Sequence, residues 1–273
     1  MEGYKMDKKY RLMFYKKNPI FIKYLRNFFN IEKGVRCRCL LVETPSHIKT
    51  QSQNTMTING KEIRTSFVYR DGSNNDYGFP LTNVIDNYCL NAVTIHFFNS
   101  IYNEGILKNN RQQDISSHII GLTPVFDIDV PKSKSIKDKR DKNDILSKPD
   151  YIEDVVEGIK IIDMELKEID EYENSSIQFS GNGFYVMLDN FYGNIDAIDL
   201  YCENFIGLVE DIIQDTGLKI DVWNRDWHRF FKAPYSFHKT YNRISVPLPR
   251  DFTYEYLLKY TNPDNYLKGK VVL

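Results

Sequence analysis

Residues 124–130 read Pro-Val-Phe-Asp-Ile-Asp-Val, and the prediction of the fold starts from this stretch. Phenylalanine, isoleucine and valine alternate in it with Val125, Asp127 and Asp129, which is the period of a half-buried strand. The two carboxylates then lie on one face, roughly 6–7 Å apart at Cα, so their oxygens can converge on a divalent cation. A strand whose outer face is merely acidic fits the same pattern, and the rest of the chain has to distinguish the two.

The composition predicts a folded protein with a large core. Of the 273 residues, 42% are hydrophobic and 14% aromatic, which excludes wholesale disorder. The length suits one large domain or two small ones. The net charge of −1 provides no overall attraction to nucleic acid, so any such attraction has to be local.

Charge is segregated along the chain. Residues 5–26 and 132–142 are rich in lysine and arginine, and residues 153–173 are rich in aspartate and glutamate. The first basic segment fits the solvated face of a helix. The second fits either a solvated linker or a contact with a phosphate backbone.

The cysteines and the apolar runs bear on the cellular compartment. The spacing of the four cysteines predicts free thiols in a reducing compartment and no zinc site: Cys37, Cys39, Cys89 and Cys202. No stretch approaches 18 apolar residues, and the N-terminus has no apolar signal core. We therefore expect a soluble protein without membrane association, cytoplasmic or, in a eukaryotic host, nuclear.

In the first 120 residues the patterns predict two helices followed by strands. Residues 4–29 are expected to form both helices, with Pro19 opening the second. A four-residue spacing predicts that Ile20, Tyr24 and Phe28 form the buried stripe of that second helix, with Ile22 and Leu25 beside them. The other expected elements are strands over 36–43 and 63–69 and a loop or exposed hairpin over 51–59.

The rest of the chain alternates between helical and extended patterns. Residues 131–150 predict an exposed basic loop, and residues 152–169 predict an amphipathic helix. The remaining expectations are a hairpin over 177–188, a helix over 196–214, a strand over 218–222, a short helix over 225–231, a loop over 234–238 and a strand over 243–248. Together they indicate a mixed α/β (α+β) chain with antiparallel pairing.

Three later features could converge with the carboxylates of the first strand. The turn Ser180-Gly-Asn-Gly can bring backbone N–H groups close to phosphate oxygens, although an ordinary turn has the same composition. The segment from Lys232 to His238 combines cationic, hydroxyl and imidazole groups that suit a polyanion. Asp221 adds a third carboxylate, enough with the other two for a pair of divalent cations.

The order of these blocks resembles the small catalytic subunit of archaeo-eukaryotic DNA primases. The matching blocks are Phe-Asp-Ile-Asp at 126–129, Phe-Ser-Gly-x-Gly at 179–183, Ile-Asp-Val at 220–222 and Lys-Ala-Pro-Tyr-Ser-Phe-His-Lys-Thr at 232–240. The last block is the most specific. The resemblance covers residues 120–248 well and the first 100 residues loosely.

The resemblance implies a fold and a domain plan. The fold is the primase-polymerase fold, with mixed sheets flanked by helices and an RRM-like catalytic half. Residues 1–273 then form a single catalytic domain, with an N-terminal α/β half up to about residue 120 and a catalytic half over 121–250 that contains the basic loop 131–150.

The resemblance also implies roles for individual residues. Asp127, Asp129 and Asp221 match the catalytic carboxylates that bind two Mg²⁺ or Mn²⁺ ions. A further set matches the positions that contact the incoming nucleotide: Ser180, Gly181, Asn182, Lys232, Ser236 and His238.

The sequence departs from the family at several points. Asn182 stands where many members have arginines, and Tyr185 stands where they have a histidine or a similar residue. The cysteine cluster of the family's zinc knuckle and the helical insertion of larger members are both missing. The chain therefore resembles a trimmed catalytic core, as expected of an archaeal, plasmid-borne or viral enzyme.

The implied activity is template-directed nucleotidyl transfer, in which a 3′-hydroxyl attacks the α-phosphate of a nucleoside triphosphate and pyrophosphate leaves. We expect short RNA or DNA primers on single-stranded DNA, made from NTPs or dNTPs, with a large primase subunit as a plausible partner. Two alternatives stay open. One is a primase-polymerase of a plasmid, virus or repair system that mainly extends primers, and the other is a catalytically silent nucleic-acid-binding subunit.

Overall fold

The computed structural model of the chain describes residues 8–29, 36–43, 54–58, 61–65, 67–68, 94–103, 119–129, 145–147, 149–169, 174–214, 218–221, 229–238 and 242–271. The prediction of a basic loop over 131–150 lies largely outside these residues. At several described positions, Asp129 and Asp221 among them, the structure describes the backbone but not the side chain.

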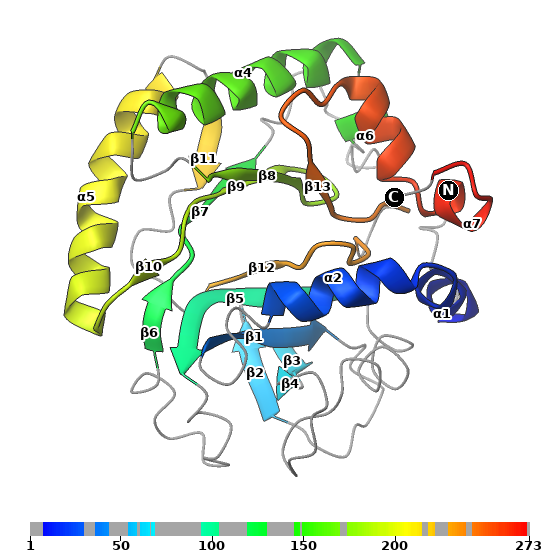
Figure 1. Cartoon of the computed structure of the whole chain (residues 1–273), viewed down its shortest axis with the longest axis horizontal. Helices are drawn as coiled ribbons and strands as arrows, with labels where there is room; N and C mark the ends of the chain where they lie inside the picture. The colour runs from blue at the N-terminus through cyan, green and yellow to red at the C-terminus, as the bar shows by residue number, and fades with distance from the viewer. Residues whose placement is uncertain are drawn as a thin grey trace.

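The strands form two main sheets and a separate hairpin (Figure 1). Their bounds are β1 Arg36–Glu43, β2 Asn54–Ile58, β3 Lys61–Thr65, β4 Phe67–Val68, β5 Thr94–Asn103, β6 Ile119–Leu122, β7 Val125–Asp129, β8 Ser176–Phe179, β9 Phe184–Met187, β10 Phe191–Tyr192, β11 Lys219–Asp221, β12 Phe230–Lys232 and β13 Val246–Leu248. The first sheet has the order β10-β6-β5-β1-β4, with β12 also paired to β5, and the second has the order β11-β7-β9-β8-β13. Each named strand pair among the described residues is antiparallel, as predicted.

Helices cover the sheets from outside. Their bounds are α1 Lys8–Lys17, α2 Pro19–Phe29, α4 Pro149–Lys167, α5 Ile195–Gln214, α6 Tyr254–Tyr260 and α7 Pro263–Leu267, with a 3₁₀ helix over Ile145–Ser147. In Figure 1, α4 runs along the outside of the second sheet and α2 lies beside the first. No helix in the described part of the chain is long and apolar enough to cross a membrane.

The long helix α4 confirms the periodicity of its sequence. It begins with Pro149, whose fixed φ and missing N–H suit the first turn of a helix. The predicted stripe is buried against the core up to Leu166, while Ile169, its last predicted member, follows the end of the helix and is only partly buried. The buried members are Ile152, Val155, Val156, Ile159, Ile162 and Leu166. Each fully buried side chain of this size contributes about 1.5–3 kcal/mol through the hydrophobic effect. This stripe therefore anchors α4 on the sheet.

Pro19 separates α1 from α2 as predicted, but the predicted stripe of α2 is confirmed only at Leu25 and at the partly buried Phe28. Phe21 and Leu25 are fully buried, whereas Ile20 and Tyr24 are 49% and 39% exposed. The physical reason is an aromatic contact: Phe21 stacks on Tyr235 with ring centroids 4.1 Å apart. Because each residue turns a helix by about 100°, that contact rotates the buried face by one position.

One other prediction needs correction, and one that left two structures open is decided. Residues Phe230–Lys232 form strand β12, where a helix was expected, because they pair with Phe98, Phe97 and His96 of β5. Residues 54–58 form β2 and pair with β3, which confirms the hairpin among the two structures expected for residues 51–59. The helices α6 and α7 follow the last predicted strand and were not anticipated.

Two neighbouring chain segments connect the two sheets beside β7. Strand β6 runs into β7 through Thr123 and Pro124, and β9 runs into β10 in the opposite direction. Leu188 N–H donates to Pro124 O at 3.0 Å, and Thr123 Oγ1 donates to Asn190 Oδ1 at 2.8 Å. These bonds join the segment between β6 and β7 to the segment between β9 and β10. They therefore fix the second sheet relative to the first beside β7.

Candidate active site

Strand β7 lies in the interior of the second sheet, between β9 and β11. The predicted alternation is confirmed: Phe126 and Ile128 are 3% and 0% exposed in the core, while Asp127 is half-buried. A β-branched and aromatic face against the core holds the strand in place, and the opposite face carries the first carboxylate.

The strand register brings two of the predicted carboxylate positions together. Asp221 on β11 stands directly opposite Asp127, and Asp129 stands directly opposite Lys219. Directly opposed positions of an antiparallel pair share one face of the sheet. Among the side chains that the structure describes, no group of three histidine, cysteine, aspartate or glutamate residues could hold a metal ion. That set does not contain the side chains of Asp129 and Asp221.

Asp127 also has a basic neighbour, which directly precedes strand β12 of the first sheet. Arg229 Nη2 donates to Asp127 Oδ2 at 3.4 Å, and both side chains are about one quarter exposed, at 26% and 23%. The sequence patterns did not point to Arg229. The available signal was its position directly before β12 and two residues before the buried Phe231.

Tyr185 stands opposite Asp127 on the other neighbouring strand. Its hydroxyl accepts a hydrogen bond from Lys232 N–H at 3.4 Å and also forms a hydrogen bond with the side chain of Ser180. Burial raises the pKa of the Tyr185 phenol above its usual value, and the negative charge of Asp127 raises it further. The phenol therefore remains protonated and available as a hydrogen-bond donor at neutral pH.

The glycine turn between β8 and β9 lies against the end of β7. Ser180 N–H donates to Gly183 O at 2.8 Å and closes the turn. A Cβ added to Gly183 would lie 3.0 Å from the carbonyl oxygen of Ile128, so the turn packs on the strand next to its carboxylates. Asn182 has a structural contact as well, since its Oδ1 accepts from Ile145 N–H at 3.3 Å.

The same turn contacts the predicted imidazole. A Cβ added to Gly181 would lie 2.8 Å from Cβ of His238 and 3.0 Å from its Cδ2. Gly181 has a φ of 101°, a conformation that other residues rarely adopt. The structure therefore places two predicted nucleotide contacts that are 57 positions apart in the sequence in direct van der Waals contact across the site.

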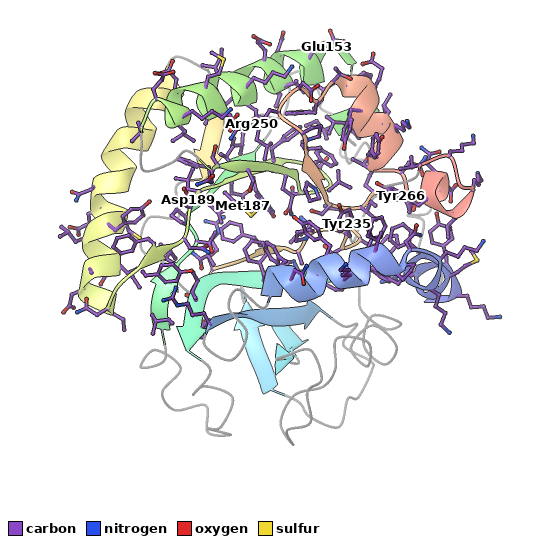
Figure 2. The ribbon with its side chains drawn as sticks, viewed as in Figure 1. Glu153, Met187, Asp189, Tyr235, Arg250 and Tyr266 are labelled. Atoms are coloured by element: carbon purple, nitrogen blue, oxygen red, sulfur yellow. The ribbon has the colours of Figure 1, made fainter. Side chains whose placement is uncertain are left out.

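The segment from Lys232 to His238 is held firmly from the side of α1 and α2. Tyr235 has a φ of 59° without being glycine. Its carbonyl accepts from the Tyr15 hydroxyl at 2.9 Å, and its ring stacks on Phe21. Figure 2 shows Tyr235 beside α2. Such strained backbone persists only where the surroundings hold it, and it occurs preferentially at functional sites.

The predicted nucleotide contacts differ in their access to solvent. His238 and Lys232 are half-buried, so part of each side chain can meet a ligand. Ser236 is fully buried, and its hydroxyl oxygen has no hydrogen-bond partner within the described part of the chain. The structure thus brings the glycine turn, His238 and β7 together, and it leaves the hydroxyl of Ser236 inside the core.

The described cysteine fits the prediction of free thiols. Cys202 on α5 is buried and unpaired. Burial raises the pKa of its thiol to about 11, with the nearby charge of Asp199 acting in the same direction. The other three cysteines have side chains outside the described set.

No family profile and no curated protein sequence matches this chain. Among solved structures it is similar to the "Polymerase Domain from Mycobacterium tuberculosis Ligase D in complex with DNA", with a TM-score of 0.57 and 10% sequence identity. The match covers 96% of this chain and 88% of that one. At this identity the likeness concerns the fold alone. The chain accordingly has the fold of that polymerase domain, a primase-polymerase fold of antiparallel sheets and helices.

Proposed function

We propose that this chain is a nucleotidyltransferase that synthesises short primers on single-stranded DNA. The observation that carries the proposal is the register of β7 and β11, which sets Asp221 directly opposite Asp127. This arrangement occurs in a fold shared with a polymerase domain in complex with DNA. Three carboxylate positions on two neighbouring strands suit a reaction in which negative charge develops on phosphate.

The donor set fits hard divalent cations. Asp127, Asp129 and Asp221 offer only carboxylate oxygens, which are the ligands that Mg²⁺ and Mn²⁺ prefer. In this proposal all three hold the ions. When bound, the ions supply positive charge both for the attacking 3′-hydroxyl and for the leaving pyrophosphate.

The other residues act on the triphosphate. The cation of Lys232 and the imidazole of His238 offset its negative charge, which makes them electrostatic stabilisers. The N–H groups of the turn at Gly181 can donate to phosphate oxygens at close range because no side chain intervenes. The Arg229 guanidinium pairs with Asp127 and orients its carboxylate.

The test is a synthesis assay on single-stranded DNA with Mn²⁺ or Mg²⁺, comparing NTPs with dNTPs and unprimed with primed strands. Asp127→Asn keeps the volume of the side chain and removes its charge. We expect it to reduce product formation by at least about 100-fold. A loss of about 100-fold is the upper range for residues that only support a metal ligand, and in this proposal Asp127 is itself a ligand. The melting temperature of the variant should stay close to that of the wild type.

A matched control is Asp189→Asn, which removes a half-buried carboxylate from the loop after β9, away from the carboxylate row. We expect full activity from this variant. Synthesis by Asp127→Asn at the wild-type rate would exclude Asp127 as a metal ligand. A wild-type protein that binds single strands but forms no product under any of these conditions would favour a silent nucleic-acid-binding subunit.

One observation favours primer extension as a second candidate function. The similar solved structure is a polymerase domain from a ligase, bound to DNA. Extension requires the same carboxylates and the same triphosphate contacts as primer synthesis. Product formation on primed strands alone would therefore assign the chain to primase-polymerases that extend existing ends.

A further inference from the structure

Within the described residues, one edge of β12 pairs with β5 and the other is closed by side chains of the second sheet. Ala233 N–H donates to Ile95 O at 2.9 Å, and Asn99 N–H donates to Arg229 O at 3.2 Å, so these alternate residues direct their peptide groups toward β5. Because main-chain groups alternate in direction along a strand, the N–H and C=O of Lys232 point to the opposite edge. An edge strand leaves such groups in need of partners.

Both groups of Lys232 find their partners in a single row of the second sheet. Its N–H donates to the Tyr185 hydroxyl at 3.4 Å, and its carbonyl accepts from Gln178 Nε2 at 2.8 Å. Asp127, Tyr185 and Gln178 stand directly opposite one another on β7, β9 and β8. Tyr185 and Gln178, which bind the peptide group of Lys232, are thus the next two residues after Asp127 in the row of directly opposed positions across β7, β9 and β8.

The contacts around this row are buried and therefore rigid. Gln178 is fully buried and Tyr185 is 5% exposed, so water does not compete for their hydrogen bonds. The Tyr185 ring meets the ring of Phe231 edge-on, with centroids 5.3 Å apart. Gln178 Nε2 also donates to Ser245 Oγ at 2.7 Å, which fixes the orientation of its amide.

We infer that Gln178 and Tyr185 are positioning residues, which act through the peptide of Lys232 to set the distance between Asp127 and the segment that ends at His238. The inference rests on the proposed function, in which Asp127 holds cations and His238 meets the triphosphate. A misplacement on the order of 1 Å can cost about 100-fold in rate. Small changes in this row are therefore enough to weaken the binding of a nucleotide that spans both sides.

The test uses Gln178→Met and Tyr185→Phe, each of which removes one hydrogen bond to Lys232 with little change in volume. Nucleotide KM and kcat are measured on a primed single strand with Mn²⁺. We expect each variant to raise the nucleotide KM about tenfold, with a smaller change in kcat. Because both bonds hold the same peptide, the double variant should raise KM by less than the product of the two single effects.

Ser245→Ala is the matched control. It removes the other hydrogen bond of Gln178 and leaves the bond to Lys232, so it should lower the melting temperature as Gln178→Met does without changing KM. Tyr185→Phe keeps the ring that packs on Phe231 and provides the test if Gln178→Met fails to fold.

If the wild type is active and the nucleotide KM of the variants is unchanged, this inference is overturned and the proposed function stands. A wild type without nucleotidyl transfer overturns the proposed function and this inference together.

Discussion

Gly181 and His238 approach each other more closely than two side chains could. The α-carbon of Gly181 packs on the imidazole, because a Cβ there would lie 2.8 Å from Cβ of His238. The φ of 101° at Gly181 independently requires a glycine. Both constraints act on the orientation of His238, so the glycine matters for more than the backbone of its own turn.

Gly181→Ala should raise the nucleotide KM about tenfold, because the added methyl group displaces the imidazole from the triphosphate. Strain in the backbone should also lower the free energy of unfolding by about 1–3 kcal/mol. Steady-state kinetics and urea unfolding measure the two effects separately.

Gly269→Ala is the control, since Gly269 also has a positive φ, of 67°, but a Cβ there would meet nothing within 4 Å. It should affect stability without affecting KM. In a His238→Ala background, the effect of Gly181→Ala on KM should largely disappear. Persistence of the full effect in that background would show that Gly181 acts independently of the imidazole.

Among the secondary-structure elements, α4 and β8 are joined through a buried carboxylate. Asp163 is 3% exposed, and its Oδ1 accepts from Ser175 Oγ at 2.8 Å. Its other oxygen bonds to Lys167, one turn later on the same helix. The contact fixes the end of α4 to the residue directly before β8, the strand that carries Gln178.

Asp163→Ala should lower the free energy of unfolding by about 1–3 kcal/mol, because the buried Ser175 hydroxyl loses its acceptor. Asp154→Ala, an exposed carboxylate on the same helix, should change it by less than about 0.5 kcal/mol. Urea unfolding of both variants gives the comparison. Equal stabilities would mean that Asp163 is solvated in solution and does not join the two elements.

Elements set by local signals were predictable from the sequence. The stripe of α4 and the hairpin around Ser180 depend on residues close together in the chain, so their patterns were sufficient. Strand β12 was not predictable, because an aromatic Phe-Phe pair suits a helix or a strand and only pairing with β5 selects the strand. The buried face of α2 likewise depends on Tyr235, which lies far away in sequence.

The same division applies to the candidate site. Alternation and motif order pointed to Asp127 and to the glycine turn, and the register of β7 with β11 agrees with the grouping of two carboxylates. The contacts of Gln178 and Tyr185 with Lys232 could not be anticipated. These contacts depend on which row of side chains in the second sheet faces β12 of the first sheet, and no local sequence pattern encodes that arrangement.

On the scale of the whole molecule, the first and last described helices pack around the segment that leads to His238. The Tyr10 hydroxyl donates to Asp264, 254 positions later in the chain. Tyr266 is 5% exposed and lies edge-on against Phe14 and Phe21, with centroids 5.8 and 5.1 Å away. Figure 2 shows Tyr266 on the same side of the molecule as Tyr235. The aromatic cluster therefore links both ends of the chain to the candidate site.

Tyr266→Ala should lower the free energy of unfolding by about 3–5 kcal/mol, because the cavity lies inside this aromatic cluster. Tyr266→Phe should cost only about 1 kcal/mol, since it loses just the hydrogen bond from the hydroxyl to Tyr260 O at 2.9 Å. Urea unfolding measures both values.

The same pair of variants tests the link between the aromatic cluster and the candidate site. Phe21 supports the strained backbone of Tyr235, so Tyr266→Ala should also raise the nucleotide KM while Tyr266→Phe leaves it unchanged. A stability loss without any change in KM would show that the cluster joins the chain ends but does not support the segment leading to His238.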